Sequence, residues 1–155
     1  MEFRVYSLNE VFQNTRLLDQ IKSITDKYEY VTREEVVSVI TDFRHDDRIC
    51  CICSVREEEI LAFAIVNTFD DVDAAWLGWF IANNEKTKGF ANKVLLDKII
   101  EFCQSKGAKK LRWYCLSESW KNVNKKAVLE RFGYNVSSVD CSGEVEIDIS
   151  DEKSL

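Results

Sequence analysis

Residues 86–93 combine the small and basic side chains of a phosphate-binding turn. The segment reads Lys-Thr-Lys-Gly-Phe-Ala-Asn-Lys and follows the apolar strand end Phe80-Ile81-Ala82. Small residues at Gly89 and Ala91 let a ligand approach the backbone closely. A helix that begins here leaves several N–H groups unpaired, and these donors and the positive end of the helix dipole favour phosphate. The pattern therefore predicts a phosphate site, with a tight turn carrying solvated lysines as the alternative.

The glycine pattern of this turn separates it from two common nucleotide-binding motifs. The chain has no G-x-x-x-x-G-K-[ST] sequence, and Gly89 lacks the spaced glycines of the dinucleotide fingerprint. The turn instead resembles the acyl-CoA pyrophosphate loop of the GNAT superfamily of N-acetyltransferases, whose pattern is Arg/Gln-x-x-Gly-x-Gly/Ala. Lys86-Thr-Lys-Gly89-Phe-Ala91 fits that pattern except for the lysine at its first position.

The elements around the turn form a strand–helix–strand unit. Residues 74–82 are very apolar, which suggests a central strand that is buried on both faces. Residues 110–116 form the next strand, and this spacing predicts that it runs parallel to residues 74–82. Between the two strands, Gly107 suits a helix C-cap. The helix before it presents apolar residues at helical spacing, namely Ala91, Val94, Leu95, Ile99, Phe102 and Cys103.

The rest of the chain supplies further strands and helices. A strand is expected at 3–6, followed by one helix from Asn9 onward and a second helix after the capping box of Thr32 and Glu35. The remaining expected elements are strands at 48–56, 60–69, 135–139 and 144–149 and a helix at 119–132. We expect residues 1–150 to form a single domain and residues 151–155 to form a polar tail.

The order of these elements is β-α-α-β-β-β-α-β-α-β-β, which predicts a mixed α/β (α+β) fold. The GNAT superfamily has this order, so the resemblance covers nearly the whole chain. It implies a mixed central sheet whose parallel fourth and fifth strands splay apart. Gly133-Tyr134 resembles the Gly-Phe or Gly-Tyr pair that ends a helix in the family, and counting back eleven residues from Gly133 gives Asn122, where members commonly carry asparagine.

The composition limits the compartment and the partners. The 155 residues carry a formal net charge of −6, which argues against binding nucleic acid through its phosphates. No run of eighteen apolar residues and no signal-peptide pattern is present, so we expect no membrane association and a cytoplasmic location. Cys50 and Cys53 form the one C-x-x-C spacing among the six cysteines, and a single histidine accompanies them, so we expect reduced core thiols and no metal.

The resemblance implies that acetyl-CoA is the acyl donor and that an amine is the acceptor. The turn and the helix start would bind the pyrophosphate, the end of strand 74–82 would pair with the pantetheine arm, and the backbone near Ile81 would donate to the oxyanion. The cofactor-binding positions are Phe80, Ile81, Ala82, Lys86, Lys88, Gly89, Phe90, Ala91, Asn92, Lys93 and Asn122. Whether the protein is a monomer or a homodimer stays open.

The sequence departs from the family at the two usual catalytic positions. Many members carry a glutamate base fourteen residues before the first loop glycine, and that position is Ala75 here. The usual tyrosine acid, four residues before the Gly-Phe pair, is Leu129. Neither side chain can transfer a proton. Asp73, Tyr114 and Tyr134 are the candidate substitutes, with a turn role as the alternative for Asp73 and packing as the alternative for the two tyrosines.

The acceptor side is less defined than the donor side. In the family, the loop between the first two helices borders the acceptor, so Tyr28, Glu29 and Tyr30 are candidate substrate-binding residues, together with Ser117 after strand 110–116. The acidic balance suits a lysine side chain, a polyamine or an aminoglycoside. Two functions therefore remain open: an acetyl-CoA-dependent N-acetyltransferase, and a protein of this fold that binds acetyl-CoA or CoA without transferring the acetyl group.

Overall fold

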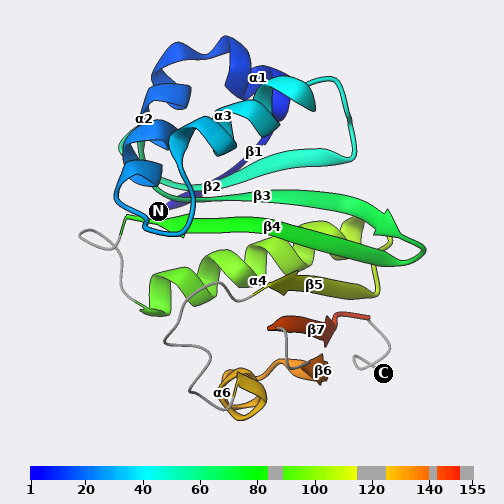
Figure 1. Cartoon of the computed structure of the whole chain (residues 1–155). Coiled ribbons are helices and arrows are strands. Elements are labelled where there is room, and N and C mark those ends of the chain that lie inside the picture. Colours follow the sequence, from blue (N-terminus) through cyan, green and yellow to red (C-terminus); the bar gives the residue numbers. More distant parts are fainter. Residues whose placement is uncertain (84–88, 115–124, 140–142, 151–155) are drawn as a thin grey trace.

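The computed structural model describes residues 1–83, 89–114, 125–139 and 143–150. Within these residues, strands form one seven-stranded sheet in the order β1-β2-β3-β4-β5-β7-β6 (Figure 1). Only the β4–β5 pair is parallel. The mixed α/β fold expected from the sequence is thereby confirmed. The strands are β1 (Glu2–Ser7), β2 (Ile49–Arg56), β3 (Glu59–Asp71), β4 (Ala74–Ala82), β5 (Lys110–Tyr114), β6 (Asn135–Val139) and β7 (Glu144–Asp148), and the helices are α1 (Leu8–Gln13), α2 (Thr15–Asp26), α3 (Arg33–Asp42), α4 (Gly89–Ser105) and α6 (Lys125–Arg131).

Asn14 divides the helix expected from Asn9 onward into α1 and α2. Its backbone is extended, its N–H donates to the Val11 carbonyl (3.2 Å), and its side-chain oxygen accepts from the Leu17 N–H (3.1 Å). The same residue therefore ends one helix and caps the next, which suits asparagine. The expectation of one continuous helix is wrong because apolar spacing does not register the cap. The capping box of Thr32 and Glu35 is confirmed at the start of α3.

Two apolar cores lie on the two faces of the sheet. On one face, α1, α2 and α3 pack over β2 and β3 and bury Ile21, Ile40 and Phe63 completely. On the other face, α4 packs through Leu95 and Ile99, which are also fully buried. Figure 1 shows α1–α3 gathered beside β1–β3, and α6 beside β6 at the opposite edge of the sheet. Strand β4 lies at the centre of the sheet, as its apolar sequence predicts.

Gly78 forms a β-bulge in the middle of β4. Ile65 of β3 pairs with Trp79 and Val66 pairs with Leu77, so Gly78 is the extra residue between them. A Cβ atom at Gly78 would lie 3.3 Å from the Ile65 carbonyl oxygen, which explains the choice of glycine. The extra residue reverses the alternation of side chains along the strand. From Trp79 onward, the residues of β4 therefore face the opposite side from the one that uninterrupted alternation would give.

The parallel pairing of β4 with β5 ends early. It runs from Ala74 opposite Lys110 to Trp76 opposite Arg112. Beyond this point β4 continues to Ala82, whereas the last residues of β5, Trp113 and Tyr114, pair with β7. The two strands therefore separate toward their C-terminal ends, which confirms the expected splay.

The expected strand limits agree with the structure to within two residues wherever the structure describes them. Helix α6 lies inside the expected helix 119–132, whose residues 119–124 fall outside the described part of the chain. The end of the expected strand at 115–116 and the tail at 151–155 also lie outside it. None of the described helices is both long enough and apolar enough to cross a membrane.

Candidate functional site

The space between the separating ends of β4 and β5 is a cleft. It has a volume of about 70 Å³, and its lining includes residues from both faces of the sheet, such as Trp79 on the α2 side and Phe80 on the α4 side. Its described lining residues are Tyr28, Leu77, Gly78, Trp79, Phe80, Ile81, Trp113 and Tyr114. Five of these residues are aromatic and none carries a charge, so the cleft is an apolar site.

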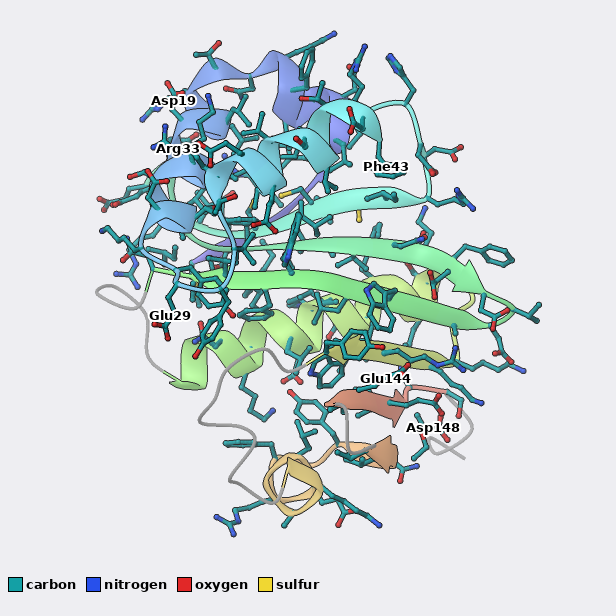
Figure 2. All side chains as sticks on the ribbon, in the orientation of Figure 1. Asp19, Glu29, Arg33, Phe43, Glu144 and Asp148 are labelled. Atoms are coloured by element: carbon teal, nitrogen blue, oxygen red, sulfur yellow. The ribbon has the colours of Figure 1, made fainter. Side chains whose placement is uncertain are left out.

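Edge-to-face aromatic pairs support two walls of the cleft. The ring of Tyr114 meets that of Trp76 at a centroid distance of 5.2 Å, and the ring of Tyr28 meets that of Tyr30 at 5.4 Å. Tyr114 is 49% exposed, so it belongs to an open surface rather than to the core. Of the residues expected to bind the acceptor, Tyr28 lines the cleft, and Glu29 is exposed on the same loop (Figure 2).

The backbone of β4 turns some of its N–H groups toward this cleft. Asn83 donates its N–H to the Leu61 carbonyl of β3 (2.8 Å). Because N–H groups alternate in direction along an antiparallel strand, the Ile81 N–H also points to β3, and those of Phe80 and Ala82 point to the open edge. Any backbone donor to the cleft near Ile81 would therefore have to be Phe80 or Ala82, because the Ile81 N–H points to β3.

Helix α4 begins seven residues after β4 ends, at Gly89. Its first turn carries the unpaired N–H groups of any helix start. Within the described residues, the Asn92 side-chain oxygen is buried without a hydrogen-bond partner. An open strand edge that leads to a helix N-terminus suits a ligand with both an amide chain and a phosphate. Lys86, Lys88 and Asn122 lie outside the described residues, and nothing is described of the side chains of Phe90 and Ala91.

Lys93 and Tyr134 are both bound to Asp97. Lys93 Nζ lies 2.9 Å from Asp97 Oδ2, and the Tyr134 hydroxyl donates to Asp97 Oδ1 (2.7 Å). The Lys93 ammonium also lies 5.5 Å from the centre of the Tyr134 ring. Burial and the hydrogen bond to Asp97 raise the pKa of the Tyr134 phenol above its usual value. Tyr134 therefore holds its proton toward Asp97 and ties the start of β6 to α4.

Asp73 lies at the opposite end of β4 from the cleft. It occupies the β3–β4 turn with a φ of 55°, and its carbonyl accepts hydrogen bonds from Lys109 (2.6 Å) and Lys110 (3.1 Å). Six residues separate it from Trp79, which corresponds to about 20 Å along an extended strand. The structure thus does not bring Asp73 together with the other candidate residues.

The usual base and acid positions are buried in the core. Ala75 is 0% exposed and Leu129 is 6% exposed, and both belong to the apolar cluster beneath α4. Ser117, the remaining acceptor candidate, lies outside the described residues. In the part of the chain that the structure describes, no three His, Cys, Asp or Glu side chains are grouped as metal ligands would be.

Trp79, Trp113 and Gly78 are cleft residues that the sequence interpretation missed. Residues 74–82 were expected to be buried on both faces, yet Gly78 is exposed and Trp79 is only partly buried. The available signal was the glycine between Trp76 and Trp79, because a glycine inside a strand often marks a bulge.

Comparisons with known proteins agree with this geometry. The model of the acetyltransferase (GNAT) family matches residues 15–134. No curated protein matches the chain in sequence. Solved structures share the fold at low identity. The aminoglycoside 6'-N-acetyltransferase from Enterococcus faecium is 11% identical with a TM-score of 0.69, covering 98% of this chain and 99% of that one.

Two further solved structures have the same architecture. The ribosomal-protein-S18-alanine N-acetyltransferase from Escherichia coli is 16% identical with a TM-score of 0.65, covering 96% of this chain and 95% of that one. The PaiA N-acetyltransferase from Thermoplasma acidophilum, solved in complex with coenzyme A, is 16% identical with a TM-score of 0.59, covering 96% and 99%. At these identities the similarity establishes the fold.

Proposed function

Because the chain belongs to the acetyltransferase (GNAT) family, we propose that it transfers an acetyl group from acetyl-CoA to a primary amine in the cleft between β4 and β5. The observation that carries the proposal is the open edge of β4 at Phe80 and Ala82, which borders the cleft and precedes the start of α4. A pantetheine chain needs such an edge for its amides, and a pyrophosphate needs such a helix start.

The donor site combines backbone groups from two elements. The Phe80 and Ala82 backbone would pair with the pantetheine arm, and the amides at the start of α4, from Gly89 to Lys93, would bind the pyrophosphate, with Lys86, Lys88 and Asn122 contributing from outside the described residues. Lys93 would act through its charge, since its ammonium is already bound to Asp97. The Thermoplasma relative, which was solved with coenzyme A, supports this choice of ligand.

In the reaction, the amine nitrogen attacks the thioester carbonyl carbon, so that a C–N bond forms and the C–S bond breaks. The Phe80 N–H would stabilise the oxyanion, because it faces the open edge and Phe80 lines the cleft. The nitrogen loses a proton to water, since no described carboxylate lines the cleft. The leaving thiolate takes a proton, and Tyr114 is the candidate donor because its ring lines the cleft.

The role of Tyr114 can be tested with the Tyr114→Phe variant. Loss of the hydroxyl should lower kcat about tenfold or more while KM for the amine stays nearly constant. The rate should rise with pH as the acceptor amine deprotonates, without a plateau set by an enzyme base. An unchanged kcat in Tyr114→Phe would contradict this role of Tyr114 and indicate that solvent protonates the thiolate.

A second candidate function is a protein that binds acetyl-CoA without transferring the acetyl group. The observation that favours it is the presence of Ala75 and Leu129, which cannot transfer protons and are buried in the core, at the usual base and acid positions. In that case acetyl-CoA would bind and no amine would be acetylated.

Calorimetry with acetyl-CoA, followed by an assay of CoA thiol release with a panel of amines, separates the two. We expect binding tighter than millimolar, and loss of binding in Gly89→Glu because a carboxylate at the helix start would repel the pyrophosphate. Glu101→Lys, an exposed charge change late in α4, is the matched control and should bind normally. Folded protein with no measurable binding would refute both functions.

A further inference from the structure

We propose that the acceptor of this protein is a primary amine attached to a flat aromatic body, rather than a polyamine, an aminoglycoside or a lysine side chain. This inference rests on the proposed function and specifies the substrate class of the same cleft. It is drawn from the residues that form the acceptor side of the cleft, where Tyr28, Trp79 and Tyr114 come from three separate elements.

The first wall of the cleft is the loop between α2 and α3, and it is fixed at both ends. The Tyr28 N–H donates to the Thr25 carbonyl (2.9 Å) at the end of α2, and Val31 is buried just before the capping box of α3. Arg33 Nε also donates to Asp26 Oδ1 (2.8 Å) across the loop. These contacts hold the loop backbone at Tyr28, and the edge-to-face contact with Tyr30 supports its ring, so less entropy is lost on binding.

The opposite wall is formed by β4 and β5. Tyr114 packs edge-to-face on Trp76, and Trp113 and Trp79 line the cleft between the strands. The bulge at Gly78 sets the position of the Trp79 ring, because it turns Trp79 toward the face covered by α2 while Phe80 faces α4. Rings on facing walls favour a flat aromatic ligand through stacked and edge-to-face contacts.

The distribution of charge argues against a polycation. None of the described residues that line the cleft is charged. Glu29, which is exposed, is next to Tyr28 in sequence (Figure 2). Glu144 lies opposite Tyr114 on β7, where its charge acts on Arg112. One exposed carboxylate beside the lining suits the single ammonium of a monoamine. The clustered acidic residues at 70, 71 and 73 lie at the far end of β4, so the net charge of −6 is not concentrated on the cleft.

The proposed acceptor class differs from those that the overall charge suggested. Charge summed over the chain describes its average surface, whereas the acceptor meets only the few side chains at the splay. A ligand with several charges would lose hydration in the cleft without gaining partners there. An aromatic monoamine would bury its ring and keep its one charge at the rim.

The test measures acetyl-CoA-dependent thiol release with 2-phenylethylamine and tryptamine against spermidine, kanamycin and Nα-acetyl-lysine amide. We expect kcat/KM for the two aromatic amines to be at least about tenfold higher. Tyr28→Ala should raise KM for 2-phenylethylamine about tenfold and leave KM for acetyl-CoA unchanged. Phe43→Ala is the matched control, since Phe43 is 46% exposed at the other end of α3 (Figure 2), and it should behave as the unmodified protein.

Two variants test Trp79. Trp79→Phe should retain the preference for aromatic amines, and Trp79→Leu should lose it. If the larger change unfolds the protein, Trp79→Phe still tests the inference. Preference for spermidine, kanamycin or the lysine amide would overturn the inference, as would equal losses for all amines in Tyr28→Ala. Calorimetry separates a failure of the proposed function from a failure of the inference about the acceptor. Without acetyl-CoA binding the proposed function fails, whereas selective binding of 2-phenylethylamine would still support the cleft assignment. If acetyl-CoA binds and 2-phenylethylamine does not, the inference fails alone.

Discussion

Leu77 and Phe80 of β4 pack into the same core, beneath α4, although residues three apart on a regular strand face opposite sides. The bulge at Gly78 produces this arrangement, and it also turns Trp79 and Ile81 toward the face covered by α2. One glycine therefore decides which side chains of β4 reach each side of the cleft.

Gly78→Ala should reduce both stability and acetyl transfer. The new Cβ would lie 3.3 Å from the Ile65 carbonyl oxygen, so the bulge must shift. We expect the free energy of unfolding to fall by about 1–3 kcal/mol, which corresponds to about 3–8 °C in Tm. We expect kcat to fall by a larger fraction than the free energy of unfolding. Thermal unfolding and thiol release would measure the two effects. Gly107→Ala is the control: its φ of 93° strains the alanine with no atom nearby, so it should lower Tm and leave kcat unchanged. Equal kcat values for the two variants would contradict the role of the bulge.

Restoring the usual base with Ala75→Glu should unfold the protein rather than activate it. Ala75 is completely buried between β4 and α4, so the carboxylate would lose its hydration with no described partner. We expect the free energy of unfolding to fall by about 3 kcal/mol or more and Tm to fall by about 10 °C. Circular dichroism melting would measure it. The control Ala127→Glu introduces the same group at an exposed helix position and should leave Tm nearly unchanged. A folded, faster Ala75→Glu variant would show that this site faces the cleft.

The Tyr134–Asp97 hydrogen bond should make stability fall at alkaline pH. The pKa of Tyr134 is raised in the folded protein, first by burial and then by the bond to Asp97, so the unfolded chain loses this proton first. Its contribution is complete below the unfolded pKa of about 10 and is lost as pH rises toward the folded value. Urea unfolding from pH 8 to 11 should show a smaller alkaline decline in Tyr134→Phe than in the unmodified protein. Parallel declines would exclude this residue as a cause.

All six cysteines should titrate as free thiols in denaturant without reductant. Cys50, Cys51, Cys53 and Cys103 are free and buried in the structure, and burial raises the pKa of Cys50 and of Cys103 to about 12. These four should therefore resist alkylation at pH 8 until the protein unfolds. Mass spectrometry after labelling of native and denatured protein gives both counts. Fewer than six thiols in denaturant would indicate disulfides and contradict a reducing compartment.

The sequence alone determined the order of the strands, the central position of β4 and the parallel pairing of β4 with β5. These features follow from local information, such as the apolar run at 74–82 and the capping box of Thr32 and Glu35, and from the spacing of a strand–helix–strand unit. The departures at Ala75 and Leu129 were also visible in the sequence, since they depend only on residue identity.

Only the tertiary structure decided which residues meet in the cleft. Tyr28 and Tyr114 are 86 positions apart in the sequence, and their approach depends on how α2 packs over the sheet and where β4 leaves β5. Asp73 lies only six positions before Trp79, but it occupies the turn before β4, away from the cleft. Asp97 of α4 accepts a hydrogen bond from Tyr134, which precedes β6, 37 positions later in the chain. Such pairings arise from long-range packing, which the period of a helix or strand does not contain.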